Sequence, residues 1–228
     1  MITTRTMKFL KGVENDGTKA WIDTHRGEYD AARAEVLQAA ISLIAESTRV
    51  DERIPDNQGE PRRCVSRLNR DARFAKGKSD YKSEFFIMLY PMGKAASVAA
   101  YYLHVQPGRS YAGGGAFNPP LETLNSVREA IAADPQQFRR LLATHAVKSN
   151  FSEGLTTSGT LQQAPRGFSA EHPAIELLKL KGYCFNHPLT DSALKGPKAT
   201  SEIVQAWKAA KPLVDFINRA ARETNRPK

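Results

Sequence analysis

The sequence lacks several features that would place it in a familiar class. It has only two cysteines, Cys64 and Cys184, which lie far apart and outside any metal-type spacing. We therefore expect buried free thiols in a reducing compartment. No segment approaches the run of about 18 uncharged apolar residues that a membrane span requires, and the opening MITTRTMKFLKG lacks the apolar core of a signal peptide. We expect a soluble, cytoplasmic protein with no membrane partner.

Signatures of metal, phosphate-loop and serine chemistry are also missing. The five histidines fall in no ligand spacing such as HExxH. Ser66 is not flanked by the glycines of a nucleophile elbow. The run Gly113-Gly114-Gly115 lacks the Gly-Lys ending of a P-loop and is more typical of a turn, a bulge or a close backbone approach. We predict no metal and no cofactor.

The charge that is present is concentrated in one place. The chain has a formal net charge of +9, and residues 62–82 alone hold eight basic and two acidic side chains. The remaining residues carry 25 basic and 22 acidic side chains, so they are nearly neutral. Such local basicity favours an anionic partner at one site.

Apolar periodicity indicates helices toward both ends of the chain. Apolar residues recur every three or four positions over 18–48, which predicts one long helix, and a short helix is expected at about 4–11. Asp134-Pro135-Gln136-Gln137 is a helix start signal. The last helix is expected from about Ser201, and Pro212 should kink or split it.

Alternating apolar residues indicate strands in the middle. Residues 64–116 predict three or four antiparallel strands, and a further strand is expected at about 183–185. We predict one α+β domain over residues 1–228, with an antiparallel sheet of three to five strands packed against N-terminal and C-terminal helices.

Side-chain alternation sorts the basic segment into two faces. If 64–74 is one regular strand, its even-numbered face is mostly apolar, and its odd-numbered face carries Arg67, Asn69, Asp71 and Arg73. Arg70 then points toward the core, where a charge requires partners, so we assign it a structural role.

A second predicted strand supplies the other half of a candidate site. Over 97–106, Tyr102, His104 and Gln106 share the polar side. If the faces align, Arg67 and Arg73 clamp an anion, with Asn69, Tyr102 and Gln106 as further ligand-binding residues. In this hypothesis His104 transfers a proton, Asp71 orients an arginine or the histidine, and Tyr81 and Lys82 cover the edge.

The same residues resemble a known family. The stretch Arg67-Leu-Asn-Arg70-Asp71-Ala-Arg73-Phe74, followed by Lys78 and Tyr81-Lys82, resembles the signature of the uncharacterised bacterial and fungal domain-of-unknown-function family DUF2461. Further matching segments are Phe9-Leu10 with Trp21, Tyr101 to His104, Pro107-Gly108, Gly113 to Gly115, His172-Pro173, Leu177 to Lys179 and Lys211 to Leu213. The chain departs from the family pattern at Gly77, Ser79-Asp80 and Phe85 to Ile87. The resemblance implies one domain and one site, and it implies no reaction.

Three functional readings follow from these patterns. The first is a basic pocket for a small phosphorylated or carboxylated ligand, in a protein that is a candidate enzyme. The second, which the near-neutral remainder of the chain disfavours, is nucleic-acid binding through the 62–82 patch. The third is a structural or accessory domain whose arginines only form ion pairs. The sequence does not set the oligomeric state.

Overall fold

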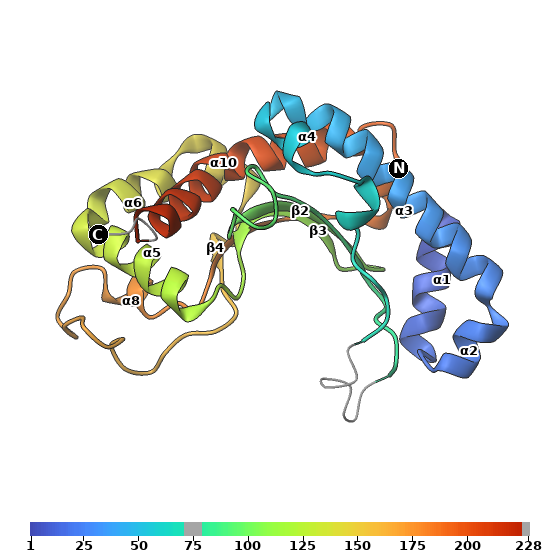
Figure 1. Ribbon diagram of the computed structural model, residues 1–228, viewed down its shortest axis with the longest axis horizontal. Helices are drawn as coiled ribbons and strands as arrows, with labels where there is room; N and C mark the ends of the chain where they lie inside the picture. Colours follow the sequence, from blue (N-terminus) through green and yellow to red (C-terminus); the bar gives the residue numbers. More distant parts are fainter. Residues whose placement is uncertain (71–78, 225–228) are drawn as a thin grey trace.

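The chain folds into helices at both ends around one sheet (Figure 1). The structure is a computed structural model, and it describes residues 1–70 and 79–224. The helices are α1 (Thr4–Asn15), α2 (Lys19–Thr24), α3 (Arg26–Glu46), α4 (Arg53–Asn57), α5 (Leu121–Ala133), α6 (Pro135–Ala143), α7 (His145–Asn150), α8 (Ile175–Leu178), α9 (Asp191–Lys195) and α10 (Ala199–Thr224), with short 3-10 turns at Ser47–Arg49 and Pro61–Arg63. The strands are β1 (Phe85–Leu89), β2 (Ala100–Val105), β3 (Ser110–Ala116), β4 (Leu155–Thr156) and β5 (Tyr183–Leu189). The predicted α+β class is confirmed.

The sheet is antiparallel and has the order β1-β2-β3-β5-β4. The register places Ile87 opposite Leu103, Leu103 opposite Ala112 and Ala112 opposite His187. Because side chains alternate along a strand, these residues share one face and their neighbours in sequence share the other. The predicted apolar side of the second strand is confirmed, since Tyr101, Leu103 and Val105 are fully buried.

Helix α10 runs along the buried face of the sheet (Figure 1). A Cβ built on Gly114 would lie 2.8 Å from a methyl carbon of Val214 and 3.0 Å from Cβ of Ala210, so the helix approaches β3 where that strand has no side chain. The indole N–H of Trp207 donates to the carbonyl of Tyr102 at 2.9 Å. The missing side chain and this hydrogen bond together fix the helix against the two central strands.

Asn218 attaches the far end of α10 to the segment that leads into β2. Its Oδ1 accepts from the backbone N–H groups of Val98 and Ala99, at 2.9 and 3.0 Å, and its Nδ2 donates to the carbonyl of Ala99 at 3.0 Å. Asn218 is 4% exposed. One side chain thus satisfies three backbone groups where the chain enters the sheet, which buried polar groups require.

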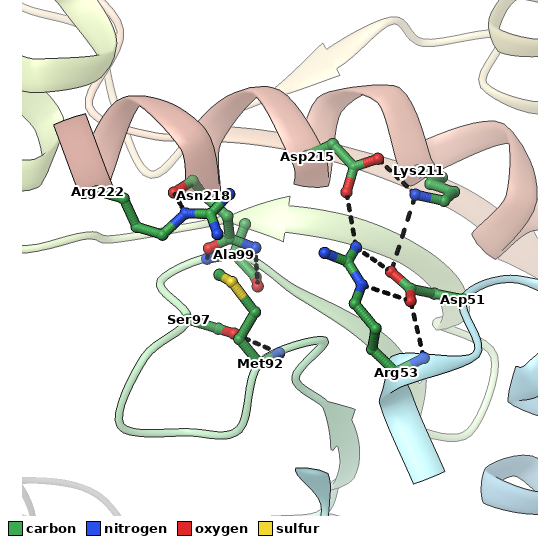
Figure 2. A network of polar contacts seen from close by, with 9 residues as sticks. All are labelled: Asp51, Arg53, Met92, Ser97, Ala99, Lys211, Asp215, Asn218 and Arg222. Carbon is green, nitrogen blue, oxygen red and sulfur yellow. Dashed lines mark hydrogen bonds and ion pairs between the residues drawn. The ribbon is translucent and has the colours of Figure 1, made fainter. Parts of the chain in front are cut away.

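An ion-pair network joins α10 to α4 on the same side (Figure 2). Arg53 contacts both Asp51 and Asp215, and Lys211 bonds Asp215 and lies 3.8 Å from Asp51. Burial is the largest influence on Asp51 and raises its pKa, but the hydrogen bonds and charges of Arg53, with the charge of Lys211, outweigh it and lower the pKa overall.

The N-terminal and C-terminal helices differ in detail from the predictions. Residues 18–48 form two helices, because the backbone of His25 leaves helical geometry (φ −105°, ψ 28°). The His25 ring stacks on the Trp21 ring, with 3.9 Å between the ring centroids. Of the two effects predicted for Pro212, a kink or a split, the split is wrong, since α10 is one element from Ala199 to Thr224. Pro212 and Lys208 are both exposed, so water can satisfy the Lys208 carbonyl that lacks an N–H partner. The start signal at Asp134 is confirmed, because its side chain accepts from the N–H of Gln137 at 2.8 Å.

The regular strand predicted for residues 64–74 is also wrong within the described residues 64–70. There the backbone makes only isolated bridges, Val65 to Ile87 and Asn69 to Tyr81. Ser66 hydroxyl accepts from the N–H of Phe86, which places a side chain where a ladder partner would stand. Residues 71–74 of the prediction lie outside the described residues.

Two further expectations concern the cysteines and membrane spans. Cys64 and Cys184 are both buried free thiols, as predicted. Burial raises the pKa of Cys184 to about 12, so its thiol remains protonated at neutral pH. Among the helices of the described residues, none combines the length and the apolar character needed to cross a bilayer.

Candidate functional site

The face of the sheet opposite α10 is the candidate site, and we call it the open face. It carries Phe86 and Met88 on β1, Tyr102 and His104 on β2, Tyr111 and Gly113 on β3, and Asn186 on β5. Phe86, Met88, Tyr111 and Asn186 are only partly buried. Most of these side chains are apolar or aromatic, so the open face differs from the polar strand face that the sequence predicted.

A hollow of about 550 Å³ lies on the open face, and we call it the aromatic hollow. Its lining comes from four strands, from the segment after β1 and from the segment after β3: Phe86, Met88, Tyr90, Lys94, Ser97, Val98, Tyr102, Tyr111, Gly115, Ala116, Phe117, Asn118, Pro119, Pro120 and Asn186. Its volume falls within the range of small-molecule sites, about 300–1,000 Å³. A few polar groups in an apolar wall is the composition that such sites share.

A hydrogen-bonded pair of side chains lies at the base of the aromatic hollow. The hydroxyl of Tyr102 bonds Asn186 Oδ1 at 2.8 Å and the carbonyl of Phe185 at 3.1 Å. Tyr111 also lines the hollow, and burial, followed by the charge of Glu84, raises its pKa to about 12. Both phenols therefore stay neutral at physiological pH and act as hydrogen-bonding groups.

His104 lies between aromatic rings and has both ring nitrogens engaged. Its ring centroid is 4.5 Å from that of Phe86 and 4.4 Å from that of Tyr111. Nδ1 is 3.2 Å from the carbonyl oxygen of Arg109, and Nε2 is 3.1 Å from Glu84 Oε2. The hydrogen bond from His104 lowers the pKa of Glu84, although burial of that carboxyl acts in the opposite direction. In this arrangement His104 positions two of the rings that flank the site.

A second hollow, of about 660 Å³, adjoins the first, and we call it the basic hollow. It is lined by Arg33, Glu60, Arg62, Arg63, Cys64, Val65, Ser66, Arg67, Met88, Tyr90 and Lys94. Five of these side chains are basic and only Glu60 is acidic; Glu60 is paired with Arg62. Arg63, Arg67 and Lys94 make no ion pair within residues 1–70 and 79–224. Met88, Tyr90 and Lys94 line both hollows, so the two lie side by side.

Comparison with known protein families identifies the family of this chain. The family described as "Conserved hypothetical protein (DUF2461)" matches residues 5–216. The chain belongs to this family. No curated protein and no solved structure matches the chain. The description of the DUF2461 family names no activity.

The structure brings some of the predicted site residues together. Tyr102 lines the aromatic hollow, His104 lies beneath its rings, and Arg67 lines the basic hollow. Gln106 follows the end of β2, where its N–H donates to Ser110 Oγ. Asp71 and Arg73 lie outside the described residues.

Other predicted residues lie away from both hollows. Asn69 is exposed and bridges to Tyr81, whose side chain belongs to the hydrophobic core. The N–H of Lys82 donates to the carbonyl of Leu68 at 2.8 Å. Arg70 is partly buried, and its Nε makes no hydrogen bond within the part of the chain that the structure describes. The positive charge of Arg70 also makes a small contribution to lowering the pKa of Glu84.

The sequence reasoning missed much of the lining. Phe86 and Met88 lie on the same face of the sheet as Tyr102, which follows from the pairing of β1 with β2 and not from the sequence of β1 alone. Phe117 and Asn186 come from segments far apart in the chain, and no local pattern connects them. Lys94 lies in the segment that follows β1, and its place in the lining of both hollows depends on how that segment folds.

Proposed function

We propose that this DUF2461 protein binds a small organic anion, a carboxylate or phosphate that also carries an apolar or aromatic group. The apolar part occupies the aromatic hollow and the anionic part occupies the basic hollow. The observation that carries the proposal is that the two hollows are adjacent and share Met88, Tyr90 and Lys94 in their lining. A ligand with both kinds of group can therefore contact both surfaces at once.

The charge balance of the basic hollow supports an anion. Arginine forks hold carboxylates and phosphates through paired N–H groups, and Arg63 and Arg67 are exposed and face such a space without a carboxylate partner among the described residues. Lys94 adds a compact positive charge at the junction. In this proposal Arg67 keeps the anion-binding role that was predicted from the sequence. Tyr102 orients the Asn186 side chain through the hydrogen bond between them.

The proposal is tested with the naphthalene sulfonate dye ANS, which combines an aromatic body with an anion. ANS fluorescence should rise and saturate with the folded protein, whose integrity is verified by a cooperative thermal transition. The double variant Arg63→Ala/Arg67→Ala should weaken ANS binding by roughly tenfold, because about 1.4 kcal/mol of charge-assisted contact is removed. The matched control is Arg140→Ala/Lys208→Ala, which removes two exposed positive charges that line neither hollow.

Equal loss in both double variants would show that only net charge matters, and the proposal would fail. The nucleic-acid alternative is tested in the same preparation by filter binding of a single-stranded oligonucleotide. Binding of the oligonucleotide that falls steeply with salt, together with no saturable ANS signal, would favour that alternative. If neither probe binds the folded protein, the basic hollow serves structure.

A further inference from the structure

We infer that the ligand is a free nucleotide, with its base in the aromatic hollow and its phosphate in the basic hollow. This inference rests on the proposed function and narrows the class of organic anion. Three features of the aromatic hollow carry it: an exposed stacking ring, a glycine that leaves backbone open in the lining, and one amide that remains available as a hydrogen-bond donor.

The stacking ring is Phe117. It follows the last residue of β3, lines the aromatic hollow and is 57% exposed. Large apolar side chains with this exposure are few among the described residues, where the others are Ile41 and Leu121. A planar ring that stacks on Phe117 would remove this apolar surface from water and gain the attraction between aromatic faces.

The floor beside Phe117 is formed partly by backbone. Gly115 lines the aromatic hollow and has a φ of +139°, a conformation that residues with a Cβ rarely adopt. Since Gly115 has no side chain, a flat ligand can approach the backbone of β3 there, next to Phe117.

The amide is that of Asn186. Its Oδ1 is held by the Tyr102 hydroxyl at 2.8 Å, which orients the side chain. Its Nδ2 makes no hydrogen bond within residues 1–70 and 79–224, and Asn186 lines the aromatic hollow. An oriented amide N–H group recognises an acceptor at the edge of a planar ring, and nucleobases present ring nitrogens and carbonyl oxygens there.

The side-by-side arrangement of one aromatic hollow and one basic hollow fits a single nucleotide better than a single-stranded nucleic acid. Base, sugar and phosphate follow one another in a nucleotide, as the aromatic lining, the junction at Lys94 and the arginines follow one another here. The hollow is flanked by the turn containing Lys94 and by the segment from Phe117 to Pro120. A single-stranded nucleic acid would instead use a groove that tracks its backbone with repeated basic side chains.

The test is isothermal titration calorimetry with adenosine monophosphate and uridine monophosphate. At least one should bind saturably, and adenosine, uridine and ribose phosphate should each bind at least about tenfold more weakly, because each occupies only one hollow. Phe117→Ala should weaken binding by about 5- to 100-fold, the range for loss of one stacking ring. Leu121→Ala is the matched control, since Leu121 is 68% exposed but lies outside the lining.

Asn186→Ala provides the second variant, because Tyr102 keeps its contact with the Phe185 carbonyl and the fold should be retained. It should weaken binding of the nucleotide and of the free nucleoside by a similar factor while leaving the weak binding of ribose phosphate unchanged. If neither nucleotide binds but ANS still does, and still depends on Arg63 and Arg67, the inference is wrong and the proposed function stands. If a nucleotide binds and Phe117→Ala behaves like Leu121→Ala, the base lies elsewhere and the inference is also wrong.

Discussion

The ring of Tyr102 lies against Gly113, the residue directly opposite it on β3, and its hydroxyl reaches Phe185 and Asn186 on the next strand, β5. A Cβ built on Gly113 would be 3.3 Å from the Tyr102 ring and 1.8 Å from the carbonyl oxygen of Phe185. One tyrosine thus bridges three strands over a position that has no side chain. This contact also holds Asn186 at the base of the aromatic hollow.

Gly113→Ala should destabilise the protein strongly. The added methyl group would overlap the Phe185 backbone, so β3 and β5 would have to separate, and we expect a loss of more than about 3 kcal/mol in the free energy of unfolding. Urea denaturation followed by circular dichroism measures it. Gly27→Ala in α3 is the control, because nothing lies within 4 Å of its built Cβ; it should stabilise by up to about 1 kcal/mol. A Gly113→Ala protein as stable as the wild type would refute the close approach of β3 and β5.

Asn218→Ala should destabilise more than Asn218→Asp. Alanine leaves the N–H groups of Val98 and Ala99 and the carbonyl of Ala99 without their partner, and each unsatisfied buried group costs about 1–3 kcal/mol. Aspartate keeps an oxygen that accepts from both N–H groups, but its second carboxylate oxygen takes the place of the Nδ2 donor and repels the Ala99 carbonyl oxygen. We expect a loss of at least about 2 kcal/mol for alanine by urea denaturation, whereas the exposed control Lys208→Ala should stay within about 0.5 kcal/mol. Equal stability of Asn218→Ala and the control would contradict the anchoring role.

The Asp51 network should make stability depend on pH. Its folded pKa lies below the ordinary value, so its contribution is present above the unfolded pKa of about 4 and is lost as pH falls through the folded pKa. Asp51→Asn should therefore lower the free energy of unfolding at pH 7 by about 1–3 kcal/mol, because charge-assisted hydrogen bonds to the partly exposed Arg53 guanidinium are weakened. The difference between variant and wild type should shrink toward pH 3. A difference that does not vary with pH would exclude an electrostatic origin.

The Glu84 carboxyl should titrate below its ordinary range because of His104. In a His104→Leu variant the hydrogen bond to Glu84 is lost while much of the burial remains, so the pKa of Glu84 should rise. Carbon-13 NMR of the carboxyl groups measures both values. Glu60 is the internal control, since its lowered pKa arises from Arg62 and should not change. An unchanged pKa for Glu84 would show that the two side chains are not coupled in solution.

Several features of this fold could be predicted because their signals are local. The Asp134 cap needs only its own side chain and the N–H of Gln137, three residues later. The alternation that places Tyr101, Leu103 and Val105 on one side is a property of any strand with one buried face. The excess of basic residues near Arg67 is likewise a fact of composition, and the structure places Arg67 on the edge of a hollow.

The two wrong secondary-structure predictions share one physical cause, which is contact between segments that are far apart in the sequence. The alternation at 64–70 reads as a strand, but the Ser66 hydroxyl and isolated bridges replace a continuous ladder beside β1. Pro212 reads as a helix break, but the packing of α10 on β3 through Gly114 keeps the helix whole. In each case tertiary contacts outweighed a local preference of about 1–3 kcal/mol.

The sequence by itself determined the α+β class, the helix start at Asp134, the buried stripe of β2 and the place along the chain where positive charge gathers, because each depends on neighbouring residues. Only the tertiary structure decided which side chains share the open face. Phe86, Tyr102 and Asn186 meet there through the register of β1, β2, β3 and β5. A one-residue change of register would send each side chain to the opposite face, so the site depends on strand pairing.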